Sequence, residues 1–254
     1  MILNASVMGD GKPLVLLHGL FGAARNLGVL SRGLAGQARV IALDLRNHGE
    51  SPHGAAMDFP TMAADVAETL TAMGVTRADV AGHSLGGKTA MALALMRPEM
   101  VDRLAVLDIA PIAYGHDYDD YVRAMRAIDL HPGLTRAAAE QALAPVVKAA
   151  PMRAFLLNNL VLGAEPRWRV GLEEIAGAMP DLLSWIDPPG AEPFTGPTLF
   201  LSGAESDYVR PEADAPIRRL FPNAVRREIA GAAHWLHADK PAEVIASLQE
   251  FFAP

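Results

Sequence analysis

A serine lies between two glycines in Gly82-His83-Ser84-Leu85-Gly86, after an apolar run and before a helical pattern. This spacing suits a nucleophile at a sharp strand-to-helix turn, because glycines two positions before and after the serine relieve the crowding of a strained backbone. The hydroxyl would lie at the positive end of the helix, with the Leu85 N–H free to bind an oxyanion. The segment therefore predicts acyl transfer through a covalent intermediate on Ser84.

The same residues permit a second interpretation. Gly82 to Thr89 match the phosphate-binding pattern G-x-x-x-x-G-K-[ST], and an apolar run ending at Asp108 resembles a strand that supplies a Mg²⁺ ligand. One turn cannot serve both chemistries, so residues elsewhere must distinguish a hydrolase from a nucleotide-binding protein.

Two histidine-containing segments favour the hydrolase. His18 to Gly22 follow an apolar run where a second oxyanion donor is needed, and we expect this donor to be the Leu20 N–H. His234 follows the last expected strand, where a hydrolase has its general base, and the order serine, acid, histidine fits such an enzyme. A phosphate-binding loop explains neither segment and usually follows the first strand of its sheet.

Apolar runs and helical stretches alternate along the chain, as in a parallel sheet with crossover helices. The expected strands are Ile2–Val7, Leu14–Leu17, Val40–Asp44, Asp79–Ala81, Leu104–Leu107, Thr198–Leu201 and Val225–Ile229. The expected helices are Leu27–Leu34, Met62–Met73, Leu85–Met96, Glu212–Leu220 and Ala242–Phe252. The pattern predicts an α/β fold, with a mostly parallel sheet and helices on both faces.

The alternation stops between Ile112 and about Pro193. This stretch shows no convincing strand, only helical patterns at Tyr118–Ala127, Ala137–Lys148 and Met152–Val161. Helices inserted between two strands predict a lid over the site. We therefore expect a core of residues 1–111 and 194–254 and a helical cap of residues 112–193, inserted after the strand that ends near Asp108.

Composition excludes several classes of protein. The chain has 254 residues, of which 51% are hydrophobic, enough for one large α/β domain. A net charge of −7 argues against nucleic acid as a partner, and the lack of cysteine excludes disulfides, thiolate metal sites and a cysteine nucleophile. No apolar run reaches the roughly 18 residues of a membrane span, and no signal segment is visible, so we expect a cytoplasmic protein.

Several motifs together resemble the YbfF-type esterases, which are small α/β-hydrolases. The matching segments are His18–Gly22 with Asn26–Gly28, Asp44–Gly49 with Ser51, Gly82–Lys88, Leu107–Pro111, Arg167–Val170 and Gly231–Trp235. The match spans nearly the whole chain, and its Arg-Asn-His-Gly and Gly-Gly-Lys pieces are more specific than G-x-S-x-G alone. The resemblance implies an α/β-hydrolase fold and an esterase or thioesterase that acts on small-molecule acyl esters without a cofactor or metal.

The acid that orients His234 has two candidates. Asp207 lies one position late for a usual Gly-x-x-Asp pattern, and Asp108 follows an earlier strand. The resembled family has its acid at the position of Asp108 and a serine at that of Ser206, near the histidine. We therefore predict Asp108 as the acid, with Ser206 in support.

The remaining candidates have less specific interpretations. We expect His18 and His48 to support loops and His83 to pack beside the nucleophile. We expect His237 to have a surface or support role because no third metal ligand accompanies it. Lys88 is expected to pair with a buried carboxylate rather than to catalyse. Four aromatic residues of the expected cap either line an acyl pocket or pack within the cap: Tyr114, Phe155, Trp168 and Trp185.

The sequence thus predicts a carboxylesterase or thioesterase. Its catalytic residues would be Ser84, His234 and Asp108, and its oxyanion hole the N–H groups of Leu20 and Leu85. A perhydrolase or lactonase would use the same triad, whereas a binding protein of this fold would usually lack a triad member. Acyl length, leaving group and oligomeric state stay open.

Overall fold

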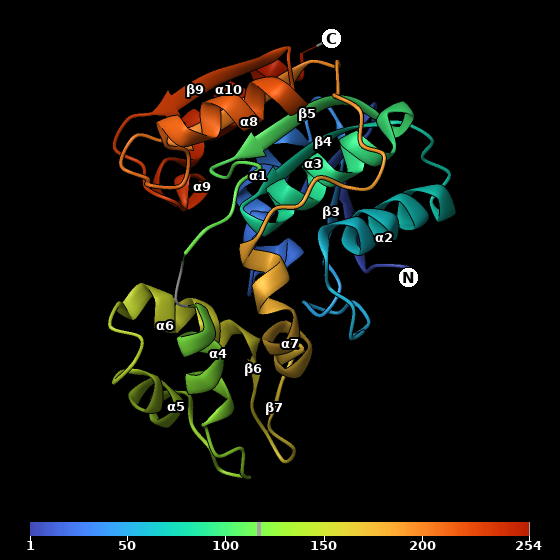
Figure 1. Ribbon diagram of the computed structural model, residues 1–254. Helices are drawn as coiled ribbons and strands as arrows, with labels where there is room; N and C mark the ends of the chain where they lie inside the picture. Colours follow the sequence, from blue (N-terminus) through green and yellow to red (C-terminus); the bar gives the residue numbers. More distant parts are fainter. Residues whose placement is uncertain (116–117, 254) are drawn as a thin grey trace.

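The computed structural model describes residues 1–115 and 118–253 (Figure 1). Its centre is a seven-stranded sheet in the order β1-β3-β2-β4-β5-β8-β9, in which β1 is antiparallel to β3 and the other neighbours are parallel. The strands are β1 (Ala5–Met8), β2 (Pro13–Leu17), β3 (Arg39–Leu43), β4 (Ala78–His83), β5 (Val101–Leu107), β8 (Thr198–Gly203) and β9 (Ala224–Ile229). The mostly parallel sheet confirms the predicted fold class.

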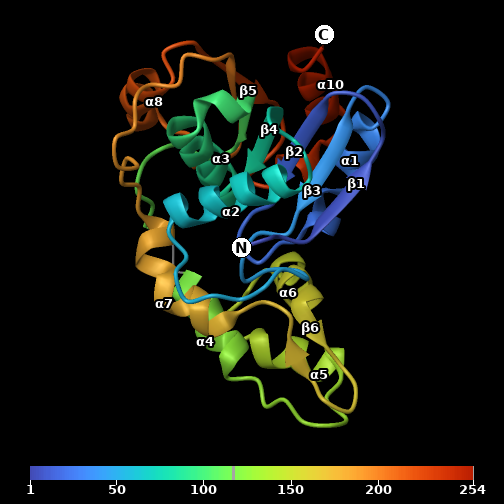
Figure 2. The same cartoon turned by 90° about the vertical axis from the view of Figure 1, so that its right-hand side faces the viewer.

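Helices cover both faces of this sheet (Figure 2). On one face α1 (Gly28–Leu34) packs against α10 (Pro241–Phe251), and on the other α2 (Phe59–Ala72) packs against α3 (Leu85–Met96). The remaining helices of the sheet domain are α8 (Asp214–Leu220), the short α9 (Leu236–Asp239), and the 3₁₀ turns η1 (Ala24–Leu27), η2 (Pro98–Met100) and η4 (Pro211–Ala213).

Alternating side chains of each strand build the two halves of the core. In β2, Val15 and Leu17 join the apolar cluster under α2 and α3, whereas Leu14 and Leu16 join the cluster under α1 and α10. Successive strand residues point to opposite faces, so a continuous apolar run is what a strand covered on both sides requires. The expectation from the run Leu14–Leu17 is confirmed.

Between β5 and β8 the chain leaves the sheet and forms a group of helices beyond its carboxyl edge (Figure 1). We call residues 109–197 the β5–β8 segment. Its elements are α4 (Tyr118–Arg126), α5 (Arg136–Leu143), α6 (Ala150–Leu156), η3 (Leu157–Asn159), β6 (Leu160–Val161), β7 (Arg167–Trp168) and α7 (Leu172–Leu183). No helix in the described part of the chain is long and apolar enough to cross a membrane.

The structure corrects three expectations in this segment. The strands β6 and β7 pair antiparallel where no strand was expected, and the helices expected to continue to Lys148 and Val161 end at Leu143 and Leu156. Strands of two residues are too short to show an alternating pattern. The helix α7 was not expected either, because Pro180 lies inside it and interrupts the helical signal.

Candidate active site

Ser84 occupies the turn between β4 and α3 with φ 52° and ψ −117°. A positive φ is uncommon for residues other than glycine and turns the chain sharply. A Cβ at Gly82 would lie 2.1 Å from the Gly86 carbonyl oxygen, and a Cβ at Gly86 would lie 2.4 Å from the Leu17 carbonyl oxygen. The predicted need for glycine on both sides of Ser84 is therefore confirmed.

The phosphate-binding interpretation of the same segment does not fit this geometry. The helix α3 already begins at Leu85, and the Lys88 N–H donates to the Ser84 carbonyl oxygen at 3.1 Å. A loop that cradles phosphate needs several free N–H groups arranged around the anion. Here only the first turn of α3 keeps such groups, and the Leu85 N–H is one of them.

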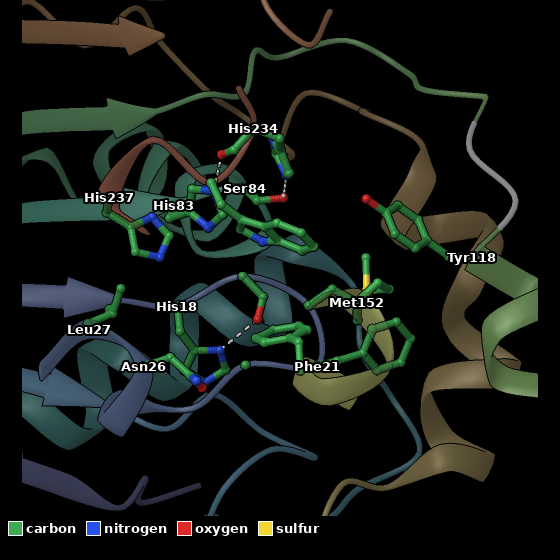
Figure 3. A pocket seen from close by; sticks show the side chains of 15 residues that line it. His18, Phe21, Asn26, Leu27, His83, Ser84, Tyr118, Met152, His234 and His237 are labelled. Atoms are coloured by element: carbon green, nitrogen blue, oxygen red, sulfur yellow. Dashed lines mark hydrogen bonds between the residues drawn. The ribbon is translucent and has the colours of Figure 1, made fainter. Parts of the chain in front are cut away.

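Ser84, His234 and Asp108 form one hydrogen-bonded chain at the carboxyl edge of the sheet. His234 Nε2 lies 3.1 Å from Ser84 Oγ (Figure 3), and His234 Nδ1 lies 2.7 Å from Asp108 Oδ2. The imidazole is 19% exposed and the carboxylate is fully buried. The histidine can therefore meet a solvent-borne substrate while the carboxylate fixes its orientation.

The structure brings only one of the two candidate acids to the imidazole. Asp108 also accepts a hydrogen bond from the Gly203 N–H at 2.9 Å and another from the Ser206 hydroxyl, so three donors hold its carboxylate. Asp207 is exposed and pairs instead with Arg210 at 2.8 Å. The position of Ser206 agrees with the support expected of it.

Tyr208 is a neighbour of His234 that the sequence analysis missed. Its ring stacks on the imidazole, with ring centroids 3.6 Å apart and an angle of 12° between the planes. The Tyr118 hydroxyl bonds to the Tyr208 hydroxyl, and the Tyr114 hydroxyl donates to the Tyr208 carbonyl oxygen at 2.8 Å. The only sequence signal is its place two residues after Ser206.

Two buried histidines hold the loop that carries Leu20. His18 Nε2 accepts a hydrogen bond from the Leu45 N–H at 3.0 Å, and His48 Nε2 accepts one from the Phe21 N–H at 3.1 Å. Each Nδ1 must then carry the proton, which it donates to a carbonyl oxygen, that of Gly19 for His18. Burial lowers the pKa of both imidazoles, that of His48 to about 3, so both are neutral supports as expected.

Four successive loops at this edge each contain a strained residue. Phe21, Asn47, Ser84 and Asp108 follow β2, β3, β4 and β5, and each has a φ between 52° and 64°. They are the only described residues other than glycine with positive φ. Such strain persists only where the surrounding structure imposes it. We call residues 18–22, 44–51, 83–84, 108, 203–208 and 230–237 the core edge.

The comparison with known families now decides the identity of the fold. The sequence profile described as "alpha/beta hydrolase fold" matches residues 12–241. The chain belongs to the α/β-hydrolase family.

Relatives of this α/β-hydrolase are named as esterases and lipases. It is 43% identical to the "sn-1-specific diacylglycerol lipase ABHD11" of Xenopus tropicalis, over 95% of this chain and 78% of that protein. It is 35% identical to "Esterase YbfF" of Escherichia coli, over 95% of this chain and 93% of that protein, which confirms the resemblance found in the motifs. A solved "Marine microorganism esterase" superposes with a TM-score of 0.95 at 33% identity, covering 99% of each chain.

Two small cavities meet at Ser84 in this α/β-hydrolase. The His234 cavity, of about 40 Å³, is lined by His234 and Trp235 of the core and by residues of the β5–β8 segment such as Met152 and Phe155 (Figure 3). A groove of about 290 Å³ shares Phe155 and Trp235 with this cavity. The Lys88 cavity, of about 30 Å³, is lined by Leu20, Ser84, Leu85, Lys88, Ile109, Tyr114, Tyr118, Leu182, Leu183 and Tyr208.

Lys88 does not have the carboxylate partner that the sequence analysis expected. Its Nζ donates to the Ser184 carbonyl oxygen at 2.6 Å and lies over the rings of Phe59 and Tyr114. The end of α7 presents unpaired carbonyl groups, and a cation there is favourable. The partner of Lys88 is therefore a carbonyl group at the end of α7 rather than a carboxylate.

His83 and His237 lie behind the imidazole of His234. His83 Nε2 donates to the His234 carbonyl oxygen at 2.8 Å, and His237 packs edge-on against His83 at 4.5 Å. Burial lowers the pKa of His237 to about 4, so it is a neutral packing residue rather than a surface one. Within residues 1–115 and 118–253 no group of three His, Asp or Glu side chains could hold a metal ion.

The four aromatic candidates of the β5–β8 segment divide into two pairs. Phe155 lines the His234 cavity, and Tyr114 lines the Lys88 cavity. Trp185 packs against Phe59 and donates to Asp187, whereas Trp168 lies in the short strand β7. The first pair therefore faces the site, and the second packs within the surrounding structure.

Proposed function

We propose that this α/β-hydrolase cleaves acyl esters or thioesters through an acyl-enzyme on Ser84. The observation that carries the proposal is the continuous hydrogen-bonded chain from Ser84 through His234 to the buried Asp108, with two cavities that both reach the serine. The esterases and lipases among its relatives support the same reaction.

The reaction proceeds in two acyl-transfer steps. His234 takes the proton of Ser84 as the hydroxyl oxygen attacks the carbonyl carbon, and the buried carboxylate of Asp108 stabilises the imidazolium that results. His234 then gives this proton to the departing alcohol or thiol, which leaves the acyl group on Ser84. A water molecule, deprotonated by His234, attacks the acyl-enzyme and releases the acid.

Two backbone N–H groups serve as the oxyanion hole. Leu85 provides the first, because it begins α3 and its N–H has no acceptor within the helix. Leu20 provides the second, on the loop that His18 and His48 hold in place. One such donor contributes about 2.7–4 kcal/mol to transition-state stabilisation.

The β5–β8 segment serves as the cap of this site. Met152 and Phe155 of α6 and Tyr118 of α4 reach the cavities that meet at Ser84 (Figure 3). The core would comprise residues 1–111 and 194–254, and the cap residues 112–193. A cap in this place selects substrates and keeps bulk water from the acyl-enzyme.

Labelling by a fluorophosphonate tests the nucleophile directly. The probe should add one phosphonyl group, and mass spectrometry should place it on the peptide that carries Ser84. Ser84→Ala should abolish both labelling and hydrolysis of p-nitrophenyl acetate while the melting temperature is retained. A labelled residue elsewhere, with Ser84→Ala still active, would exclude this mechanism.

A further inference from the structure

Lys88 is the feature of the site that acyl transfer leaves unexplained. Its side chain lies on α3 one helical turn after Ser84, and only 2% of the residue is exposed. Nζ donates to the Ser184 carbonyl oxygen, and the ring centroids of Tyr114 and Phe59 lie 4.8 and 5.2 Å away. Among the described residues no carboxylate comes within ion-pair distance of Nζ. Neutral groups alone therefore surround a buried amine.

The orientation of the substrate in the proposed reaction determines which part of it would contact Lys88. His234 must protonate the leaving group, so the leaving group lies on the side of Ser84 where His234 is found. His234 lines the cavity on that side. The Lys88 cavity opens at Ser84 and Leu85 and has no wall formed by His234. It is therefore the cavity that receives the acyl group.

The walls of the Lys88 cavity favour a short acyl chain with a charged end. Ile109, Leu182 and Leu183 are aliphatic, and Lys88 is the one residue of the lining that carries a formal charge. A volume of about 30 Å³ leaves no room for a long chain. In such a poorly hydrated place an opposite charge interacts strongly, and a carboxylate would accept hydrogen bonds from the remaining ammonium protons.

We propose that the Lys88 cavity is an acyl-binding site that selects acyl groups ending in a carboxylate. The preferred substrates are then half-esters of short dicarboxylic acids, with the ester carbonyl at Ser84 and the free carboxylate at Lys88. This inference rests on the proposed function, because the position of the nucleophile and base fixes the direction of the acyl chain.

The ionisable groups of the Lys88 cavity provide a check on this inference. Burial lowers the pKa of Lys88 to about 7, and burial raises the pKa of the phenols that face it, Tyr114, Tyr118 and Tyr208. The other neighbours, the Ser184 carbonyl and the Phe59 ring, do not ionise. Lys88 is then the group of the cavity that loses its charge as the pH rises through about 7, and selectivity for a carboxylate should fall with it.

The experiment compares two esters of matched shape, monoethyl succinate and ethyl isocaproate, in which an isopropyl group replaces the carboxylate. The measured quantity is the ratio of their kcat/KM values, because an effect of pH on the shared catalytic residues acts on both esters alike. We expect the wild-type ratio to exceed one at about pH 6 and to fall by about pH 8.5. Lys88→Met should lower the ratio about 10- to 100-fold, as expected for a hydrogen bond to a charged group.

A matched control and the wild-type protein keep the test decisive. Lys148 is exposed and its ammonium group donates to the nearby Pro145 carbonyl oxygen, so Lys148→Met should leave the ratio unchanged. If Lys88→Met fails to fold, the pH dependence of the wild-type ratio still decides. A wild-type ratio below one, or a loss of both activities in equal measure in Lys88→Met, would overturn the inference. If Ser84 is labelled and ethyl isocaproate is cleaved, that result leaves the proposed function standing.

Discussion

The core edge and the β5–β8 segment contribute to the same cavities by different means. In the core edge several hydrogen bonds hold the candidate acid, since the Asp108 carboxylate accepts from Gly203, Ser206 and His234. In the segment, Met152 and Phe155 reach the site as half-buried apolar side chains that only pack. On the proposed function, we expect the core edge to determine the chemistry and the segment to determine which substrate can approach. Changes in the first should therefore act on kcat, and changes in the second on KM.

The strongest test of this division concerns the acid of the core edge. Asp108→Asn should keep the side-chain shape but present the wrong tautomer of His234, so kcat should fall about 10⁴-fold with little change in KM. Steady-state kinetics and a melting curve on the same preparation would measure this. Asp207→Asn is the matched control and should retain nearly full activity, since Asp207 pairs with Arg210 at the surface. A dead Asp207→Asn beside a healthy Asp108→Asn would assign the acid to the later loop.

A second test uses four of the five histidines of the core edge. The pKa values of His18, His48, His83 and His237 are lowered mainly by burial, whereas the unfolded chain binds protons near pH 6.5. Because the unfolded state then holds more protons, stability should fall as the pH drops below about 6.5, by about 1.4 kcal/mol per pH unit for each histidine. Urea unfolding between about pH 7 and 5 would measure this slope.

His48→Gln should lower the slope of stability against pH by about 1.4 kcal/mol per pH unit, the contribution of one histidine. His131→Gln, at an exposed histidine of the β5–β8 segment, is the matched control. A slope that is equal in all three proteins would show that these histidines gain their protons without unfolding the core edge.

The smallest expected effect belongs to the segment. Phe155 lines the His234 cavity and its outer groove and packs on Trp235, with ring centroids 5.6 Å apart. Phe155→Ala should raise KM about 10-fold for esters of bulky alcohols, because apolar contact is lost, and should change kcat for ethyl acetate little. Ile186→Ala, at a side chain that is 76% exposed, serves as the control. A large fall in kcat for ethyl acetate would contradict the division.

The sheet and the position of Ser84 could be predicted because strong local rules apply there. The run Leu14–Leu17 must be apolar on both faces, and the turn at Ser84 excludes any side chain at Gly82 and Gly86. Such constraints involve only a few consecutive residues and can therefore be recognised in the sequence. The choice of Asp108 over Asp207 needed a family resemblance, because a one-residue slip in a loop redirects a side chain and leaves little trace in composition.

The β5–β8 segment was harder to predict because packing rather than local pattern decides its structure. The pairing of β6 with β7 involves two residues on each side, and α7 continues through Pro180 in its last turns. The partner of Lys88 was wrong for a related reason. Its acceptor is the main-chain carbonyl of Ser184, 96 residues later in the chain. Every residue has such a carbonyl, so the type of residue does not mark the partner.

Because of the four positive φ angles, selection for heat resistance would disfavour the residues now present at these positions of the core edge. Phe21, Asn47, Ser84 and Asp108 would each be more relaxed as glycine, since such a backbone conformation costs other residues about 1–2 kcal/mol. Two of these replacements remove the proposed nucleophile and its acid. Selection for stability alone would therefore favour replacements that remove activity. Screens for stable variants should also require activity when these four positions are varied.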